Sequence, residues 1–444
     1  MEKNLPKNWV ETYLYEIVQP VKTGVTEFED IKDYYSTGSI KESEFTVEGK
    51  FNFKERPSRA NREVYEFDIL QARMENTDKA VLIDKKLNRS LFSTGFIQLR
   101  SYGSTIIPKY TYYFVKSEYF NRQKNELASG TTQVAINDAN AKKILFPLPP
   151  LAEQQRIVAK LGVLFDNLEV LKTRLDHIPQ LLKNFRQAVL TQALKGELTK
   201  DLRQNKSLRN WEQTSLGLIT ELITSGSRGW AKYYSGEGAI FVRAQNINKD
   251  FLDLSDVAFV KLPNKSEGIR SRIFEDDLLI TITGANVTKT AIVDFYIEEA
   301  YVSQHVSLVR LNNPDFAPFI YMFLINESHG RKQLIDFAYG QGKPQLNLSN
   351  IKDVKIDLPS KEEQTEIVKR VEALFTKADK IETQYQSLKI KTDSLPQAIL
   401  AKAFKGELVE QLDTDGSATV LLEEIKKLKE LLKPVKKSVK RKKK

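Results

Sequence analysis

The sequence predicts an α+β protein in which two mixed α/β domains are separated by two long helices that pack as an antiparallel coiled coil with pseudo-twofold symmetry. Three observations predict this arrangement. The chain has 444 residues, which is too long for one ordinary hydrophobic core. Two blocks of sequence occur twice at a constant offset of 210 residues. The apolar residues between the blocks follow a heptad pattern in both copies.

The repeat is defined by two blocks that match without a gap. Leu148 begins the segment LPPLAEQQRIV, which matches the segment LPSKEEQTEIV that begins at Leu358. Gln187 begins the segment QAVLTQALKGEL, which matches QAILAKAFKGEL from Gln397 onward. A register that is kept across both blocks indicates one structural unit that occurs twice.

Between the blocks, apolar residues alternate at spacings of four and three, which places one narrow apolar seam on a helix. Such a seam must be covered by another helix, and the simplest partner is the other copy. Two unrelated amphipathic helices in separate cores are the alternative, but they would leave the shared register unexplained. The predicted seam residues are Ile157, Leu161, Leu164, Leu168, Leu171, Leu175 and Ile178 in the first copy, and Ile367, Val371, Leu374, Ala378, Ile381, Tyr385 and Leu388 in the second.

Prolines and glycines predict where each helix begins and ends. The predicted starts follow Pro150 and Pro359, interruptions before a short second helix are predicted near Pro179 and Pro396, and the ends are predicted at Lys195-Gly196 and Lys405-Gly406. The seam from residue 157 to residue 178 spans about 32 Å at 1.5 Å per residue. This length is close to the roughly 34 Å repeat of B-DNA, so an antiparallel pair could hold two domains about one helical turn apart.

The segments before the helices are similar in length and agree mainly at their edges, where Trp9 matches Trp211. Both interiors indicate mixed α/β domains. Strands are predicted at 80–83, 95–99, 277–283 and 306–310, and helical stretches at 112–120 and 319–324. The predicted boundaries are 1–147 for the first domain, 148–204 for the first helical repeat, 205–357 for the second domain, 358–412 for the second helical repeat, and 413–444 for a C-terminal helix and basic tail.

The net charge of +10 is concentrated at the C-terminus. Residues 433–444 contain eight Lys or Arg and no acid, so the remainder of the chain carries only about +2. We expect this tail to be a solvated arm, with non-specific phosphate contact as the alternative. The chain has no cysteine, which excludes disulfides and thiolate sites and is consistent with a cytoplasmic protein. No apolar run approaches the roughly 20 residues that span a bilayer, so no membrane contact is expected.

Basic, amide and aromatic residues gather in both domains where turns are expected. Arg, Asn and Gln can pair with base edges in the major groove, whereas Lys and hydroxyl groups contact phosphates. For any single residue a solvated loop is the plainer interpretation, and only the clusters favour DNA contact. The candidate DNA-binding residues are Arg56, Arg59, Asn61, Arg62, Arg73, Asn76, Arg100 and Tyr102 in the first domain, and Arg228, Trp230, Lys232, Tyr233, Gln245, Asn246, Asn286, Gln304, Lys343 and Gln345 in the second.

The order of domain and repeat resembles the specificity subunits of Type I restriction–modification systems over essentially the whole chain. The motifs that carry the resemblance are Glu153-Gln154 followed by Ile157-Val158, its copy at 363–368, and Gly-Glu-Leu at 196–198 and 406–408. The resemblance implies that each variable domain is a target-recognition domain that reads one half of a split, asymmetric sequence in double-stranded DNA. It also implies that the helices set the spacing and provide docking surfaces for two methyltransferase subunits, which restriction/translocase subunits join.

No catalytic or metal site is predicted in this chain. The nearest string to a methyltransferase loop, Asn313-Pro-Asp-Phe, has an acid in place of the second proline. No glycine-rich nucleotide loop occurs, and His305 has no second ligand at a metal-binding spacing. S-adenosylmethionine, ATP and Mg are therefore expected in partner subunits and no cofactor in this chain. A coiled-coil adaptor that joins two protein-binding domains without reading DNA, and a concealed single-chain nuclease, are the alternatives.

Overall fold

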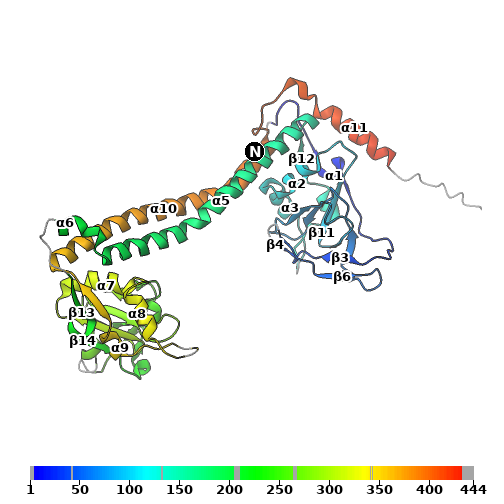
Figure 1. Ribbon diagram of the computed structural model, residues 1–444. Coiled ribbons are helices and arrows are strands. Elements are labelled where there is room, and N and C mark those ends of the chain that lie inside the picture. The colour runs from blue at the N-terminus through cyan, green and yellow to red at the C-terminus, as the bar shows by residue number, and fades with distance from the viewer. Residues whose placement is uncertain are drawn as a thin grey trace, which may run out of the picture. The chain divides into compact units, whose positions relative to one another are not determined.

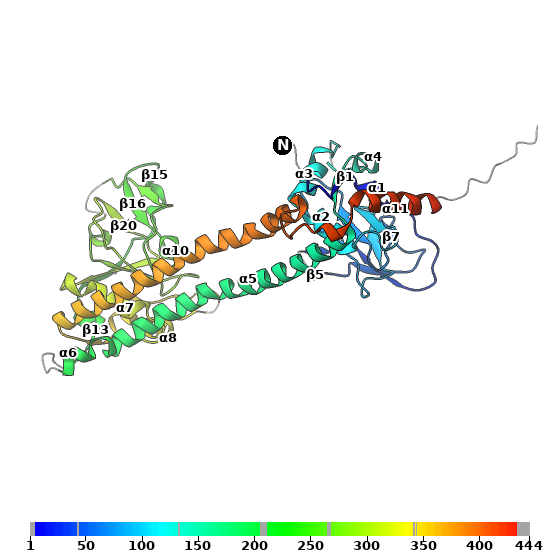
Figure 2. The ribbon, with the colours of Figure 1, turned by 90° about the horizontal axis from the view of Figure 1, so that it is seen from above.

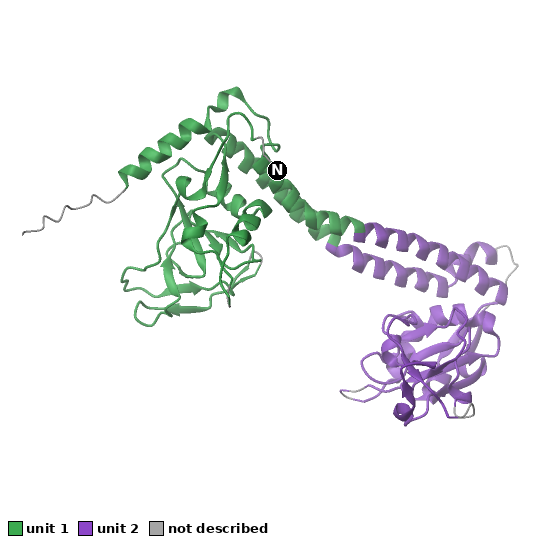
Figure 3. Cartoon of the chain, turned by 180° about the vertical axis from the view of Figure 1, so that it is seen from behind, with its two compact units in different colours: residues 1–175, 387–444 green, residues 176–386 purple. Residues whose placement is uncertain are grey.

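The chain forms two compact units, which Figure 3 shows in different colours. Unit 1 consists of residues 1–175 and 387–444, and unit 2 consists of residues 176–386. Each unit therefore contains one α/β domain, the first part of the long helix that follows it, and the last part of the other long helix. The computed structural model describes residues 5–41, 44–131, 134–204, 211–263, 268–340, 342 and 344–432.

The two repeats form two long helices, α5 (Leu151–Leu194) and α10 (Lys361–Lys405), which Figures 1 and 2 show in green and orange. In unit 1 the start of α5 and the end of α10 contribute to one core, and in unit 2 the start of α10 and the end of α5 do so. The beginning of each helix thus packs against the end of the other, which confirms the antiparallel pair. Gly196 (φ 70°) and Gly406 (φ 76°) follow the helix ends in the left-handed conformation, as the sequence predicted.

The predicted interruptions at Pro179 and Pro396 were wrong, because both helices continue through these residues. A proline inside a helix removes one backbone hydrogen bond and costs about 3 kcal/mol. Continued burial along the helix offsets this cost. Leu182, one turn beyond Pro179, and Leu400, one turn beyond Pro396, are both buried, the latter in the core of unit 1.

Eight of the fourteen predicted seam residues are buried, three are partly buried and three are exposed. One position of each heptad is consistently buried, at Leu161, Leu168 and Leu175 in α5 and at the matching positions of α10. The alternate heptad position contains Leu171 and Ile381, which are 41% and 49% exposed, and Leu388 is also 49% exposed. The prediction of burial was wrong for these three residues, because two helices alone cover only one strip of each other's surface and leave the edge of the seam in solvent.

The first domain contains two four-stranded sheets, with strand orders β2-β11-β8-β9 and β6-β3-β10-β7, and the pair β1-β12. All pairs are antiparallel except β3 with β10. The strands are β1 (Val10–Tyr13), β2 (Val18–Pro20), β3 (Lys32–Tyr35), β4 (Ile40–Lys41), β5 (Glu44–Phe45), β6 (Gly49–Phe51), β7 (Ala60–Glu63), β8 (Ile69–Ala72), β9 (Ala80–Leu82), β10 (Leu91–Ser93), β11 (Phe96–Ser101) and β12 (Leu145–Leu148). The helices are α1 (Leu14–Ile17), α2 (Pro108–Lys116), α3 (Glu118–Glu126) and α4 (Asp138–Ala141).

The second domain repeats the first sheet, as β14-β21-β18-β19, and the strand pair, as β13-β22, but its second sheet has a different order, β15-β17-β16-β20. The parallel pair is β16 with β20. The strands are β13 (Glu212–Ser215), β14 (Thr220–Ser225), β15 (Tyr234–Ser235), β16 (Ala239–Val242), β17 (Ala258–Val260), β18 (Leu278–Thr281), β19 (Thr290–Ile292), β20 (Ala300–Val302), β21 (Val306–Leu311) and β22 (Lys355–Leu358). The helices are α6 (Lys200–Gln204), α7 (Ala317–Ile325), α8 (Gly330–Phe337) and α9 (Leu348–Lys352).

The predicted strands are all present, and the predicted helical stretch 112–120 covers parts of two helices that separate at Ser117. The Ser117 hydroxyl accepts a hydrogen bond from the Phe120 amide (3.2 Å) and thereby caps α3. The stretch 319–324 lies inside α7.

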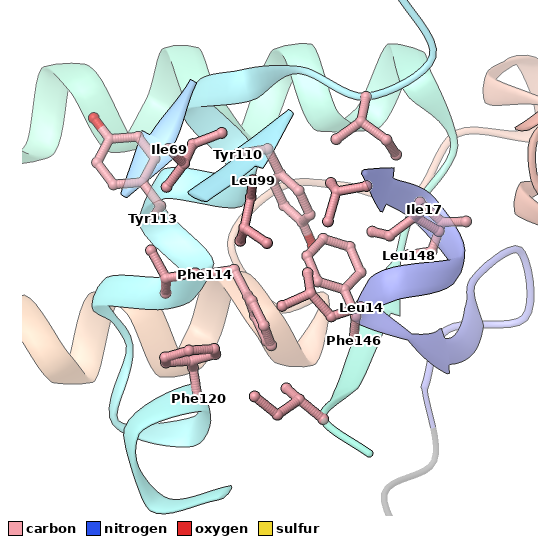
Figure 4. Close-up of a cluster of buried hydrophobic side chains, with 14 of the residues drawn as sticks. Leu14, Ile17, Ile69, Leu99, Tyr110, Tyr113, Phe114, Phe120, Phe146 and Leu148 are labelled. Atoms are coloured by element: carbon pink, nitrogen blue, oxygen red, sulfur yellow. The ribbon is translucent and has the colours of Figure 1, made fainter. Parts of the chain in front are cut away.

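The sheets β2-β11-β8-β9 and β14-β21-β18-β19 are buried on both faces, because successive side chains along their strands point into two different cores. In β8, Ile69 belongs to the core shared with the helices, whereas Leu70 belongs to the core beneath the second sheet. Figure 4 shows the helix-side core of unit 1, where Phe114 and Phe146 meet with ring centroids 4.6 Å apart. The strands of the second domain alternate in the same way, with Leu278 and Leu279 in different cores.

The chain continues after α10 into α11 (Ala418–Leu431), which packs on the core of unit 1 through Leu421 and Ile425. The Lys429 ammonium group also lies 2.9 Å from the Glu16 carboxylate. The predicted basic tail at 433–444 lies outside the described residues. Within the described part of the chain, no helix is both long and apolar enough to cross a membrane.

Candidate nucleic-acid interface

The repeated Glu-Gln motif joins each domain to its helix. In unit 1 the Trp9 indole donates a hydrogen bond to the Glu153 carboxylate (2.8 Å), and in unit 2 Trp211 donates to Glu363 (3.0 Å). Both carboxylates are fully buried. We call these two pairs the Trp–Glu anchors. Because they fix the first strand of each domain to the first turn of the following helix, the orientation of each domain on its helix is built into the repeat.

Each anchor carboxylate receives a second hydrogen bond. The Gln411 amide donates to Glu153 (2.6 Å), and the Thr199 hydroxyl donates to Glu363 (2.6 Å). Burial raises the pKa of Glu153, and the hydrogen bonds from Trp9 and Gln411 partly oppose this rise.

A second repeated residue fastens the far end of each helix to the domain. The Gln397 side chain accepts a hydrogen bond from the Glu118 amide (2.7 Å) at the start of α3. Gln187, at the matching position of α5, accepts one from the Glu327 amide (2.9 Å). The residues that define the repeat in the sequence therefore make contacts inside the chain.

Three candidate DNA-binding residues of the first domain have structural partners in this fold. Arg62 is 2% exposed, donates to the Val21 carbonyl (2.9 Å), and has a pKa that burial lowers to about 10. Tyr102 is buried in the core of unit 1. Arg100 donates two parallel hydrogen bonds to the fully buried Asp68 carboxylate (2.6 and 2.7 Å).

The pair of Arg100 and Asp68 recurs in the second domain, where Arg310 donates to Asp277 at 2.8 and 2.7 Å. A contact that is kept in both domains while their surfaces differ serves the common fold. We therefore assign Arg62, Tyr102 and Arg100 to structural roles, because their side chains are buried or already paired.

The remaining candidates of the first domain are at least partly accessible. Arg59 and Asn76 are exposed, whereas Arg56, before β7, and Asn61, within β7, are partly buried. Arg73 is largely committed to the fold, since it donates to the Asp138 carboxylate (2.5 Å) and to the Phe96 carbonyl (3.2 Å). Arg56, Arg59 and Asn61 thus form the most accessible polar cluster among the candidates of the first domain, and their contact with DNA remains a prediction.

The second domain contains a cavity of about 330 Å³ where three of the predicted clusters meet. These clusters lie far apart in the sequence, near residues 230, 245 and 304, and the fold brings them together. The cavity is lined by Ser227, Gly229, Trp230, Ala231, Tyr234, Phe241, Arg243, Ala244, Gln245, Ser303, Gln304 and His305. Tyr234, Arg243 and His305 are missing from the predicted set, although each lies within two residues of a predicted member.

Two candidates in the second domain are buried. Trp230 is 4% exposed and packs in an aromatic cluster, and Asn246 is 3% exposed and donates to the carbonyls of Asp253 and Asp256 (both 2.9 Å). We assign Asn246 to a structural role because its amide is used to hold this loop.

The other candidates of the second domain differ in exposure. Lys343 lies outside the described residues. Exposed positions are occupied by Arg228, Lys232, Gln245 and Gln345, and partly buried ones by Tyr233, Asn286 and Gln304.

Comparison with known proteins gives a consistent result over most of the chain. A family model described as the Type I restriction modification DNA specificity domain matches residues 6–180 and 211–390. The Type I restriction enzyme StySPI specificity subunit of Salmonella potsdam is 34% identical over 335 residues, which are 72% of this chain and 72% of that protein. The EcoBI specificity subunit of Escherichia coli is 33% identical over 329 residues, 68% of each chain.

Solved structures share the fold. The HsdS subunit from Thermoanaerobacter tengcongensis aligns with a TM-score of 0.65 at 20% identity and covers 92% of this chain and 100% of its own. A chain from a structure on complex assembly and conformational transition of the type I R-M system aligns with a TM-score of 0.67 at 19% identity, over 91% and 99% of the two chains. Together, the two matched segments and the relatives above 30% identity show that the chain belongs to the specificity subunits of Type I restriction–modification systems.

Proposed function

We propose that this specificity subunit reads a bipartite, asymmetric sequence in double-stranded DNA, with one half-site contacted by each α/β domain. The observation that carries the proposal is the contrast between repeated anchors and divergent surfaces. The Trp–Glu anchors and the Gln187 and Gln397 contacts recur in both units. The exposed polar residues differ, so two domains attached in the same way present different groups to DNA.

The recognition chemistry is supplied by accessible Arg, Lys and Gln side chains. In the first domain these are Arg56 and Arg59, and in the second Arg228, Lys232 and Gln245. Paired donors and acceptors on Arg and Gln discriminate bases in the major groove, while Lys and the remaining Arg contact phosphates.

The helices offer the docking surface for two methyltransferase subunits. Apolar residues that the helix pair leaves in solvent lie along α5 at Val163 (58% exposed) and Val170 (52%) in unit 1, and at Leu181 (62%) in unit 2. Contiguous exposed apolar patches mark partner contacts, and we infer that these residues belong to such a patch. Restriction/translocase subunits join through the methyltransferases.

Catalysis belongs to the partners in this proposal, together with S-adenosylmethionine, ATP and Mg. The chain itself selects the sequence and sets the gap between the half-sites. A cytoplasmic location follows from the proposal because the DNA substrate is there.

The test is methylation mapping of DNA from cells that carry the chain with its methyltransferase partner, against cells that lack only this chain. We expect a bipartite motif with a fixed non-specific gap, which disappears when the chain is deleted. Unchanged methylation despite an active partner would favour the coiled-coil adaptor.

A further inference from the structure

The cavity of the second domain has an aromatic interior. The Trp230 and Phe241 rings stack with centroids 5.6 Å apart at an interplanar angle of 24°, and both residues are about 5% exposed. Tyr234 meets Phe241 edge-on at 5.6 Å but is itself 50% exposed. One aromatic side chain of the cavity is therefore accessible, and the buried rings behind it hold it in place.

The rim of the cavity is polar and carries amide groups. The Gln304 amide nitrogen lies 3.1 Å from the His305 Nε2, and the Thr283 hydroxyl lies 2.6 Å from the His305 Nδ1. The contact with His305 thus holds the Gln304 side chain at the rim of the cavity, where its amide group is placed to hydrogen-bond a ligand.

Two further side chains on the rim have hydrogen-bonding capacity. Gln245 is exposed, with its amide nitrogen 3.2 Å from the Asp256 carboxylate. The Nε of Arg243 is buried and has no hydrogen-bond partner among the described residues. The described residues that line the cavity include no acid, while Arg228 and Lys232 are exposed on either side of Trp230. This charge distribution favours an anionic backbone beside the opening.

The shape of the cavity selects among the ways in which a protein can contact DNA. Base edges in a duplex lie at the bottom of a groove, so they are reached by side chains that project from the protein. A concave site cannot do this. A volume of 330 Å³, near the lower end of the roughly 300–1,000 Å³ range of ligand pockets, fits one small planar group. A base that has left the stack is such a group, and it is held by stacking on aromatic side chains and by hydrogen bonds to its edge.

We propose that the cavity bounded by Trp230, Tyr234, Gln245 and Gln304 binds a single unstacked nucleobase of the half-site that the second domain reads. The inference rests on the proposed function and adds a second mode of recognition to it. Tyr234 stacks on the base, Gln304 and Gln245 contact its edge, and Arg228 and Lys232 contact the neighbouring phosphates.

The test uses the full chain assembled with its methyltransferase partner and a duplex that contains the mapped target. Single mismatches are introduced at each position of the second half-site, and the Kd of each duplex is measured. At positions read in a groove, a mismatch weakens binding. At a position where the base leaves the stack, a mismatch tightens binding by about tenfold. A mismatched base is already poorly paired, so less of the few kcal/mol needed to unpair it has to be supplied by binding.

Tyr234→Ala identifies which protein group receives the base, and Tyr296→Ala is the matched control, since Tyr296 is 76% exposed in the same domain and does not line the cavity. We expect one mismatch position whose tightening is lost in Tyr234→Ala and kept in Tyr296→Ala. If no mismatch tightens binding, or if every tightening survives Tyr234→Ala, the cavity does not hold a base. A base taken up by the methyltransferase, and not by the cavity, would give a tightening that survives Tyr234→Ala.

Two outcomes separate this inference from others that share its chemistry. If the wild-type complex binds all sequences equally, the proposed function fails and the inference fails with it. If the complex prefers a sequence but no mismatch tightens binding at any position, only the inference fails. A free nucleoside has the same planar chemistry, so adenosine is titrated against the complex without DNA. Saturable binding of adenosine that is lost in Tyr234→Ala would assign the cavity to a free nucleoside instead.

Discussion

Replacing Trp9 by Phe removes the indole N–H of one Trp–Glu anchor and keeps an aromatic ring at the same place. The Glu153 carboxylate then loses its 2.8 Å hydrogen bond and retains the one from Gln411. A hydrogen bond to a charged group contributes about 1.5–3 kcal/mol, so we expect unit 1 to lose about 2 kcal/mol of unfolding free energy. For a unit of this size, that corresponds to a fall in Tm of about 4–8 °C.

The assay is thermal and urea unfolding followed by circular dichroism, with Trp211→Phe as the matched change in unit 2. Both substitutions also remove ring atoms, so a double-mutant cycle with Glu153→Leu separates the hydrogen bond from packing. In the Glu153→Leu background, Trp9→Phe should cost about 2 kcal/mol less than in the wild type. An equal cost in both backgrounds would refute the reasoning, because the carboxylate would then contribute nothing to the effect of the indole.

Four further perturbations have defined outcomes. Arg59→Ala should lower the dependence of DNA affinity on salt by about 0.9 in log–log slope, measured by anisotropy, and an unchanged slope would exclude a phosphate contact. Arg100→Met should destabilise the first domain by about 3 kcal/mol in urea unfolding and leave the recognised sequence unchanged, since it leaves the fully buried Asp68 carboxylate without its guanidinium partner; a changed half-site would show that Arg100 reads DNA. Insertion of about four residues between 157 and 175 should lengthen the gap in the methylated motif, and an unchanged gap in an assembled complex would count against helix-defined spacing. Burial raises the pKa of Glu153, so the folded protein holds a proton on this residue more readily than the unfolded chain does. The contribution of Glu153 to stability is therefore largest at acid pH and falls as the pH rises above about 4.5. Glu153→Gln should flatten this decline when melting is measured at several pH values, and an unaltered profile would contradict the prediction.

Periodicity was sufficient to predict the long helices and their pairing, because a heptad specifies which face must be covered. It could not show how much of that face one partner helix would cover. Leu171 and Leu175 both belong to the heptad, but only Leu175 is buried. Which heptad position lies at the centre of the pair depends on the crossing of the two helices, which the spacing of apolar residues does not determine.

The candidate site was less predictable, because composition does not distinguish an Arg that faces DNA from one that holds the fold. Arg59 and Arg100 looked alike in the sequence, yet Arg59 is exposed and Arg100 is paired with Asp68, 32 residues away. The Trp–Glu anchors were missed for a similar reason. Trp9 and Glu153 each matched a residue of the other copy, but they are 144 residues apart and only the fold brings them together.

The division of the chain has a consequence for its synthesis. Unit 1 is interrupted in the sequence by the whole of unit 2, so its core lacks Phe404 until the ribosome has passed through unit 2 and reached residue 404. Phe404 packs 5.3 Å from Tyr110 and 5.5 Å from Phe114. At about 5–20 residues per second, roughly 10–50 s pass between completion of residue 175 and that of Phe404. During this interval the nascent first domain presents an open apolar face, which α10 covers only when its end has been made.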